Sequence, residues 1–300
     1  MSFDDGLMVG LMLGGGSGGS GDTVPDLDPD WDYWRALPDP TSSQVIYVVD
    51  AKSTDTTKSQ NDFIYLDMTK YDGDSKTPTW LIDWGDGKTT QIISESSAQH
   101  IYASLGRYVI TCTALDKYKG TVYFGNGYNS HNGLLAVKYG SDTDCYVGGN
   151  YTYWQTQSLK FFKHLGDAVF RYNYFENCYR LKAVELANPL TDVPQSMFFK
   201  CYALKKIDLS NVVTVGQAAF EYSGLEKVDM PVCTDIGQEG FNSCLALKKI
   251  SAPLCTTVGS SAFYQDYSLI SAAFADGCTF GTNAFQNCFS LNPRPDGSTD

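Results

Sequence analysis

The sequence is poor in histidine and in positive charge. Only three histidines occur among 300 residues, and they lie far apart, at His100, His131 and His164, so we expect no histidine-based metal or catalytic cluster. Lysine and arginine together number 22 against 34 acidic residues, and the formal net charge is −12. A chain this acidic repels phosphate backbones, which argues against nucleic acid as a partner.

Long hydrophobic runs and reactive motifs are also missing. The apolar run Gly6–Leu13 has eight residues, which is too short to span a bilayer, so no transmembrane segment is expected. Asp4 and Asp5 stand where an ordinary signal peptide carries basic residues, which argues against ordinary secretion. There is no nucleophile elbow, phosphate loop, H-E-x-x-H motif or paired carboxylates in a motif context. We therefore predict that the chain is no enzyme and uses no metal or cofactor.

A recurring leucine organises the second half of the chain. It stands at the head of segments such as ALKKIDL (203–209), GLEKVDM (224–230) and ALKKISA (246–252). The intervals between these leucines are 25, 22, 23, 21, 22, 22 and 22 residues. The leading leucines are Leu134, Leu159, Leu181, Leu204, Leu225, Leu247, Leu269 and Leu291. A period of about 20–29 residues built on L-x-x-L-x-L is typical of a leucine-rich solenoid.

Each unit carries a second signature before its leucine. The pattern G-x-x-[AG]-F ends at Phe220, Phe241, Phe263 and Phe285, and a cysteine or its substitute follows three residues later. The unit G-x-x-A-F-x-x-C-x-x-L-x-x-I-x-L-P resembles the BspA-like leucine-rich repeats of bacterial surface proteins, some protists and phage-borne genes. The resemblance covers about 160 residues. Helical spacing of Phe, Cys and Leu predicts a short helical turn whose apolar side faces the core.

The nine cysteines follow the same repeat. Cys178, Cys201, Cys244 and Cys288 share one position, where Ser223 and Asp266 stand in the remaining units. A second row holds Cys233, Cys255 and Cys278. Disulfides between row neighbours are one interpretation. Buried free thiols are favoured, because a small, weakly polar side chain suits a tight buried corner and the cysteine count is odd.

Residues 41–118 are predicted to form short strands. Trp84-Gly85-Asp86-Gly87, then His100-Ile101-Tyr102 and Gly106–Thr111, resemble the PKD family of immunoglobulin-like β-sandwiches. The family's usual phenylalanine and threonine are replaced here by Trp84 and Ile101. The resemblance implies a spacer, or a module that contacts proteins or glycans. Asp83 and Asp86 could bind a metal, but turn formation is the favoured interpretation.

The first 40 residues read as a flexible tail. The glycine- and serine-rich run 14–21 is a flexible linker by composition, so residues 1–21 are either disordered or a short apolar plug tethered to a larger assembly. Residues 22–40 hold alternating aspartates. They lack the glycine turn and terminal glutamate of an EF-hand loop, so a solvated linker is favoured over a calcium site.

Two outward rows on the predicted sheet are candidate binding residues. The first outward row, two residues after each leucine, is Ala136, Phe161, Ala183, Lys206, Lys227, Lys249 and Ser271. The second outward row, four residues after it, is Lys138, Lys163, Glu185, Asp208, Asp229, Ser251 and Ala273. Their lysines and aspartates either only keep a sheet face soluble or form a charged docking face for an acidic partner or glycan.

A third candidate is the tyrosine row, one residue after the cysteine position. Its members are Tyr179, Tyr202, Tyr267 and Phe289. Tyrosine offers a rigid contact area with a polar tip, which suits protein and sugar recognition. Packing between turns on the outer edge is the alternative.

The predicted fold is mainly β with short helices, an immunoglobulin-like β-sandwich followed by a leucine-rich-repeat α/β solenoid. The predicted domains are the tail 1–40, the PKD-like sandwich 41–118 and the solenoid with caps 119–300. We expect a non-enzymatic protein that binds a host-surface protein or glycan and is anchored to a particle such as a phage virion by its tail. A bacterial cell-surface adhesin and a purely structural spacer are the alternatives. The candidate ligand-binding residues are Lys206, Lys227, Lys249, Asp208, Asp229, Tyr179, Tyr202 and Tyr267.

Overall fold

A computed structural model describes residues 29–51, 64–67, 79–93, 97–115, 123–124, 133–143, 153 and 156–298. The predicted plug (1–21) and residues 22–28 of the aspartate-rich segment therefore lie outside the described residues. The chain divides into two units, residues 1–37 and 38–300. In the first unit, helix α1 (Pro29–Ala36) lies within the segment that the sequence predicted as a solvated linker. Its first residue is a proline, which is well tolerated in the first helical turn because its missing N–H has no partner there.

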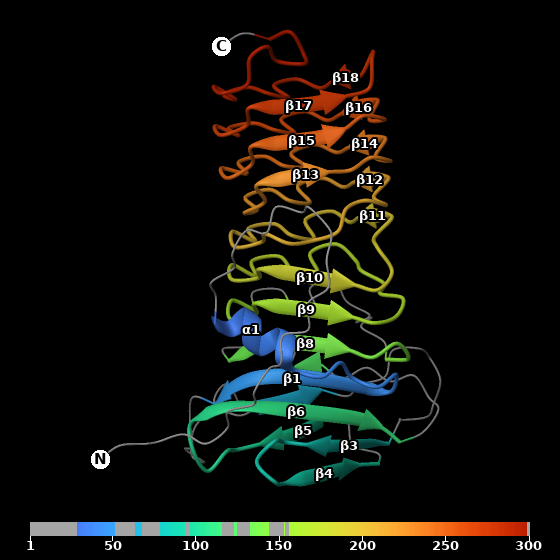
Figure 1. Cartoon of the computed structure of the whole chain (residues 1–300), viewed down its shortest axis with the longest axis vertical. Coiled ribbons are helices and arrows are strands. Elements are labelled where there is room, and N and C mark those ends of the chain that lie inside the picture. The colour runs from blue at the N-terminus through green and yellow to red at the C-terminus, as the bar shows by residue number, and fades with distance from the viewer. Residues whose placement is uncertain are drawn as a thin grey trace, which may run out of the picture. The chain divides into compact units, whose positions relative to one another are not determined.

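A seven-stranded sheet begins the second unit (Figure 1). In spatial order its strands are β10 (Ala183–Leu186), β9 (Phe161–His164), β8 (Leu134–Tyr139), β1 (Gln44–Ala51), β6 (Gly106–Ala114), β3 (Trp80–Asp83) and β4 (Thr89–Ile92). Strand β1 is central and almost continuously buried, as its run of Val, Ile and Tyr predicts. It pairs antiparallel with β6 and with β8, while β8 and β9 pair in parallel. One sheet thus joins the N-terminal strands to the first repeat strands.

The tryptophan-glycine turn of the N-terminal strands is held by its own side chains. Asp83 accepts a hydrogen bond from the Gly85 N–H at 2.9 Å, and Asp86 accepts one from the Lys88 N–H at 3.1 Å. Gly85 has a φ of 78°, and a Cβ there would lie 2.4 Å from the carbonyl oxygen of Val109. The two aspartates therefore form the turn, as the favoured interpretation of the sequence holds.

Aromatic side chains pack against the same turn. The Tyr102 hydroxyl donates to the carbonyl of Trp84 at 2.7 Å, and His100 stacks on the Trp84 ring and contacts Asp86 at 2.9 Å. A second, three-stranded sheet holds β5 (Ser97–His100), β2 (Ile64–Asp67) and β7 (Tyr123–Phe124). The immunoglobulin-like sandwich and its boundary at residues 118/119, which lies outside the described residues, stay predictions.

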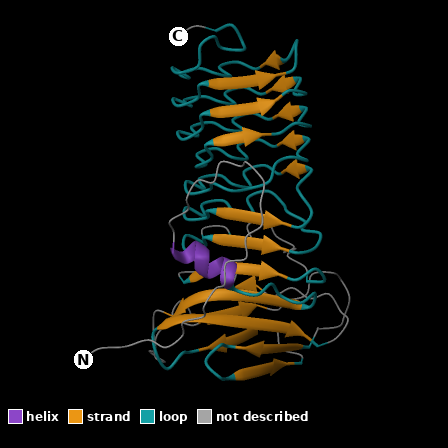
Figure 2. Cartoon of the chain, viewed as in Figure 1, coloured by secondary structure: helices purple, strands orange, loops and turns teal. Residues whose placement is uncertain are grey.

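The repeats form a β-solenoid of about six turns (Figure 2). One side is a three-stranded parallel sheet of β13 (Lys227–Asp229), β15 (Lys249–Ala252) and β17 (Ser271–Phe274). The other side stacks two-residue strands in the order β11 (Asp192–Val193), β12 (Thr214–Val215), β14 (Asp235–Ile236), β16 (Thr257–Val258) and β18 (Thr279–Phe280). Each turn of the chain contributes one strand to each side where both are formed.

The predicted short helices are absent from the described repeats, and that prediction was wrong. The segment around each repeat phenylalanine instead alternates local turns with bonds to the next repeat. Around Phe220, Ala218 and Tyr222 have φ values of 52° and 60°. The N–H groups of these three residues donate to the carbonyls of the following repeat, at Gln238, Gly240 and Asn242. Helical spacing misled the prediction, because a stacked turn with left-handed residues places the same Phe, Cys and Leu inward.

Stacked phenylalanines fill the core. Their centroids lie 5.1–5.4 Å apart, with interplanar angles of 2–10°. The column comprises Phe175, Phe198, Phe220, Phe241, Phe263 and Phe285, all buried. Tyr153 extends it onto Phe175 at 5.8 Å, and Thr156 precedes the leading Leu159 in the same turn. The repeat positions of Tyr153 and Thr156 were not predicted. The signal was present as Y-x-x-T-x-x-L, but Tyr and Thr replace Phe and Cys.

The cysteine rows lie beside this column. The eight cysteines within the described residues are free thiols. Each S–H in the first row donates to a carbonyl of the preceding turn, as Cys201 does to Phe175 and Cys288 does to Phe263. Burial raises the pKa of the Cys201 thiol well above its ordinary value. The buried thiols of the first row are structural, because a nucleophilic cysteine needs an accessible, stabilised thiolate.

Candidate functional site

The first outward row is buried in some turns and exposed in others. Ala136, Phe161 and Ala183 on β8–β10 are buried, which corrects the expectation that the whole row faces solvent. Lys206, Lys227 and Lys249 are exposed. The outward face of the solenoid is therefore open only from the turn of Lys206 onward.

The sheet breaks where this open face begins. Lys206 forms an isolated parallel bridge to Ala183 of β10, whereas β13 pairs with β15 and is the edge strand of its own sheet. The turn before β13 is one residue shorter than the others. Gly224 alone separates Ser223 from Leu225, where other units have two residues between these positions. A Cβ at Gly224 would lie 2.1 Å from the Tyr202 carbonyl oxygen, so the shortened turn packs tightly against its neighbour.

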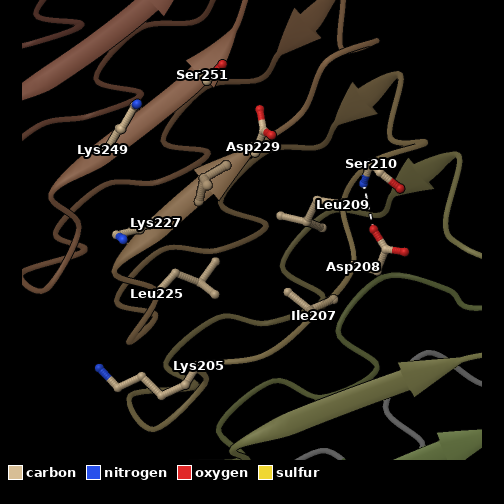
Figure 3. Close-up of a pocket in the computed structure, with 11 residues that line it drawn as sticks. Lys205, Ile207, Asp208, Leu209, Ser210, Leu225, Lys227, Asp229, Lys249 and Ser251 are labelled. Atoms are coloured by element: carbon tan, nitrogen blue, oxygen red, sulfur yellow. Dashed lines mark hydrogen bonds between the residues drawn. The ribbon is translucent and has the colours of Figure 1, made fainter. Parts of the chain in front are cut away.

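A groove of about 490 Å³ occupies the break (Figure 3). Its apolar lining comes from Ile207, Leu209, Leu225 and Val228. Its polar lining is Lys205, Lys227, Lys249, Asp208, Asp229, Ser210 and Ser251. Four of the predicted site residues, Lys227, Lys249, Asp208 and Asp229, are thus brought together here. In Figure 3 the lysines reach toward one end of the groove and the aspartates lie toward the other.

The groove's charged residues differ in how they are held. Lys205 pairs with Glu226 at 2.9 Å, and Lys248 reaches the same carboxylate at 3.3 Å. The hydrogen bond and charge of Lys205 come first among the effects that hold the pKa of Glu226 below its ordinary value. Asp208 accepts a hydrogen bond from the Ser210 N–H at 2.9 Å. Within the described residues, Lys249 and Asp229 make no ion pair, so both are available to a ligand.

Lys206, also predicted as a site residue, takes a different position. Its ammonium pairs with Glu185 at 2.9 Å, and it does not line the groove. In the described structure, this ion pair connects the turn that contains Lys206 to strand β10. Exposed pairs of this kind contribute about 0–1 kcal/mol, so the contact leaves the lysine adaptable.

Another pair of lysines, Lys138 and Lys163, already binds a carboxylate of the same chain. Lys138 and Lys163 lie directly opposite each other on β8 and β9, and the carboxylate of Asp39 accepts from both, at 3.2 Å and 2.8 Å. The Lys138 side chain is only 3% exposed. Burial lowers the pKa of Lys138, and the charge of Asp39 opposes that shift. Burial acts to raise the pKa of Asp39, but the two lysines hold it below its ordinary value.

The tyrosine row lies outside the groove lining and is interrupted. Tyr179 and Tyr202 are exposed and lie 5.5 Å apart, and Tyr267 stacks with Phe289 at 5.7 Å. Gly224 stands between these two pairs in the row. The three predicted tyrosines and Phe289 therefore form two separate exposed pairs rather than one continuous surface. Neighbouring rings cover part of each other's faces.

Comparison with known proteins supports the repeat assignment. A protein-family model described as "BspA type Leucine rich repeat region" matches residues 169–292, in six copies. This segment is built from BspA-type leucine-rich repeats. Proteins with these repeats are typically non-catalytic and bind other proteins or surfaces. The BspA-type turns include β13 and the groove. No curated protein matches the chain.

Two solved structures are similar to part of this chain. A leucine-rich repeat protein from Bacteroides ovatus is 19% identical, with a TM-score of 0.39, over 52% of this chain and 47% of its own. A leucine rich cell surface protein from Faecalibacterium prausnitzii is 18% identical, with a TM-score of 0.32, over 58% and 49%. This chain thus spans about half the length of either structure.

Neither membrane-spanning helices nor metal-ligand clusters occur in the described part of the chain. Of the helices that the structure describes, none has the length and apolar character needed to span a bilayer. Among the described side chains, no group of three or more His, Cys, Asp or Glu is placed to hold a metal ion.

Proposed function

We propose that this protein is a non-enzymatic binding protein whose open sheet face and groove, formed by the BspA-type turns, hold a protein or glycan on a cell surface. One observation carries the proposal. The groove at the edge of β13 joins an apolar floor to charged side chains of both signs. Concave sites of this size, with a few polar groups over an apolar lining, are typical of ligand binding. The site residues in this proposal are Lys227, Lys249, Asp208 and Asp229.

The remaining predicted residues have smaller roles in the proposal. Lys206 lies next to the groove, and the exposed Tyr179 and Tyr202 extend the contact surface along the outer edge of neighbouring turns. Tyr267 lies beyond the interruption at Gly224 and serves as a separate contact. Partly exposed tyrosines suit recognition surfaces because they bury a large area with little loss of conformational entropy.

The finer proposal is that the tail anchors the protein to a larger particle, such as a phage virion. The apolar run Gly6–Leu13 followed by the glycine- and serine-rich run 14–21 supports it, because an apolar plug needs a flexible tether. We expect particles from a producing culture to carry the full-length chain, and a chain with Leu7, Leu11 and Leu13 changed to Ser to remain unattached. Recovery of both forms only as free protein contradicts the anchor.

The binding proposal is tested with labelled full-length chain on immobilised glycans and on a panel of intact bacterial and epithelial cells. The Lys227→Glu/Lys249→Glu variant should lose at least tenfold in affinity for any surface that the parent binds. Lys88→Glu/Arg294→Glu makes the same change of charge away from the groove and should retain binding. If the parent binds and both variants bind equally well, the groove is not the site.

A further inference from the structure

We infer that the second cysteine row, Cys233, Cys255 and Cys278, is a site of thiol–disulfide exchange, in which Cys255 forms a disulfide with one of its two neighbours. The co-reactant is a small disulfide such as oxidised glutathione. None of the three cysteines lines the groove, so this site is separate from the one proposed for surface binding.

The short strands on one side of the solenoid bring the three cysteines to one corner. Cys233 and Cys255 each stand two residues before a strand, β14 and β16, and Cys278 stands one residue before β18 (Figure 1). The Thr256 N–H donates to the Thr234 carbonyl at 3.0 Å, so the chain beside the first two cysteines is spaced as in a parallel sheet, about 4.8 Å. Disulfides join residues whose Cα atoms lie about 4.4–6.8 Å apart, so neighbouring turns are within reach of this bond.

The sulfur atoms of the row interact with one another. Side-chain hydrogen bonds join Cys233 to Cys255, and Cys255 to Cys278. Each sulfur also contacts a carbonyl of its own turn, as Cys255 contacts Thr257 at 3.2 Å. The first cysteine row is different, because its thiols donate to carbonyls of the preceding turn. Cys255 thus lies between two thiols and is the member that both possible disulfides share.

Packing does not require sulfur at this position. Leu190 and Val212 hold it in the two preceding turns, and both are buried. The local backbone is the same, because the Val212 N–H donates to the Leu209 carbonyl as the Cys233 N–H donates to the Met230 carbonyl. An apolar side chain therefore fills this corner equally well. Contacting thiols in consecutive turns add a reactivity that packing alone does not explain.

Cys278 gives the row an entrance. Cys233 and Cys255 are buried, whereas Cys278 is partly exposed. A Cβ added at the neighbouring Gly277 would meet nothing within 4 Å, so the space beside this thiol is open. Burial still raises the pKa of Cys278 to about 11. Its reaction should therefore become faster as the pH rises toward that value, because the thiolate is the nucleophile.

The exchange consists of three displacements. The Cys278 thiolate attacks the small disulfide, breaks its S–S bond, forms a mixed disulfide and releases one small thiolate. The Cys255 thiolate attacks the Sγ atom of Cys278, forms the Cys255–Cys278 bond and releases the second small thiolate. Cys233, whose pKa is lowered by its hydrogen bond with Cys255, then attacks the Sγ atom of Cys255 and returns Cys278 to the thiolate. The protein loses two electrons and two protons, and the small disulfide gains them as two thiols.

A disulfide in the row would hold adjacent turns together covalently. A crosslink restricts the unfolded chain, so the oxidised protein should melt at a higher temperature than the reduced protein. Dithiothreitol should reverse both the bond and the shift in melting temperature. The row would thereby act as a reversible clamp on the stack of turns.

The test incubates folded full-length chain with oxidised glutathione at about pH 8.5, alkylates the remaining thiols and maps the disulfides by mass spectrometry. Trypsin cleaves after Lys248 and Lys249, so it places Cys233 and Cys255 on different peptides. Fragmentation of the peptides then identifies the two cysteines in each bond. We expect one disulfide in the row, always with Cys255 as a member.

The first cysteine row is the internal control. Cys178 and Cys201 also stand in neighbouring turns, but both are fully buried and the row has no exposed member. We expect them to form a disulfide at least tenfold more slowly than the second row. An equal rate in both rows would mean that the thiols react only after the chain unfolds, and would overturn the inference.

Valine variants separate the roles of the three cysteines, because Val212 shows that the position accepts valine. Cys255→Val should abolish the disulfide. Cys278→Val should retain the Cys233–Cys255 bond but slow its formation at least tenfold, since both remaining thiols are buried. Cys233→Val should retain the Cys255–Cys278 bond. Circular dichroism and thermal melting establish that each variant is folded before it is used.

The inference is overturned if the folded parent chain forms no disulfide in the row, or if Cys255→Val forms one as fast as the parent. Equal rates for the parent and Cys278→Val contradict the entrance at Cys278. None of these results bears on surface binding through the groove, which is measured on the reduced chain.

Discussion

The solenoid contains two stretches that use the same repeat position differently. On β8–β10 the outward side chains are Ala136, Phe161 and Ala183, and they are buried. From the next turn onward the same position holds Lys206, Lys227 and Lys249, and it is exposed. The residue type at this position thus differs between the buried and the exposed parts of the sheet face. Apolar residues stand in the covered turns, and charged residues that keep the face soluble stand in the open turns.

The ionisable groups of the two stretches also differ. In the covered stretch Asp39 is bridged by two lysines, which hold its pKa below the ordinary range against the effect of burial. In the open stretch the buried Asp266 has no cationic partner among the described residues, and burial raises its pKa well above the ordinary range. The covered stretch therefore holds a buried lysine against a carboxylate, whereas the open stretch holds a buried carboxyl whose neutral form is favoured.

The largest expected effect comes from the phenylalanine column that both stretches share. Phe241→Ala should lower the free energy of unfolding by about 3–5 kcal/mol, because the removal of a buried ring that stacks between Phe220 and Phe263 leaves a cavity. Chemical denaturation followed by circular dichroism measures the change. Phe289→Ala removes an exposed ring and is the matched control, with an expected loss below about 1 kcal/mol. Equal losses would mean that the column does not form the core.

The next effect tests the covered stretch. Asp39→Ala removes the carboxylate that accepts hydrogen bonds from Lys138 and Lys163 and should cost about 1.5–3 kcal/mol, because hydrogen bonds to charged groups are among the stronger ones. Glu185→Gln breaks the exposed pair with Lys206 and should cost less than about 1 kcal/mol. Denaturation curves of the two variants distinguish these outcomes. A smaller loss for Asp39→Ala than for Glu185→Gln would remove the distinction between the stretches.

Asp266 tests the open stretch. It stands at the cysteine position, and one carboxylate oxygen accepts from the Cys244 N–H at 2.7 Å. The other oxygen has no hydrogen-bond partner in the part of the chain that the structure describes. Asp266→Cys restores the residue of neighbouring turns and should raise stability at pH 7 by about 1–3 kcal/mol, since it removes an unsatisfied buried group. Asp276→Cys changes an exposed aspartate and should have little effect. Destabilisation by Asp266→Cys would show that the carboxyl has a role the repeat needs.

Glu221 gives the pH dependence. Burial, with repulsion from Glu239, raises its pKa to about 7 from an ordinary value of 4.5. A group whose pKa is raised on folding contributes stability below about pH 4.5 that is lost as the pH rises through 7. Glu221→Gln should therefore reduce the loss of stability between pH 5 and 8 by about 1–2 kcal/mol, allowing for solvent screening of a half-buried group. Melting curves across this range measure it, and an unchanged pH dependence contradicts the assignment.

The smallest expected effect concerns the groove. Lys249→Ala should change stability by less than about 0.5 kcal/mol, because the side chain is exposed and makes no ion pair among the described residues. Ligand binding should nevertheless weaken at least tenfold. A stability loss above about 1 kcal/mol in denaturation would instead assign Lys249 to the fold.

Much of the core could be predicted from the sequence. The leucine, phenylalanine and cysteine positions recur at a fixed period, and the residues at those positions are buried as expected, apart from the partly exposed Cys278. The local conformation was not predictable in the same way. Phe, Cys and Leu at i, i+3 and i+6 fit a helical turn and a stacked turn with left-handed residues equally well. Bonds between turns, such as Phe220 N–H to the Gly240 carbonyl, decide between them.

The candidate site divides in the same manner. Its residue types and outward direction follow from the period-two alternation of a strand, so Lys227, Lys249, Asp208 and Asp229 could be selected from the sequence. Their gathering around one groove could not, because it depends on where the sheet breaks. Tyr202 and Tyr267 belong to separate pairs, because Gly224 and Leu245 hold this position of the row in the two turns between them.

The sequence by itself determined that residues 134–291 stack as leucine-rich turns, because a repeated pattern of apolar residues can bury itself only against its neighbours. The tertiary structure alone decided that β1 joins the first repeat strand, that Asp39 closes over Lys138 and Lys163, and that β13 is left as an edge. These features depend on contacts between residues far apart in the chain, and no local pattern encodes them.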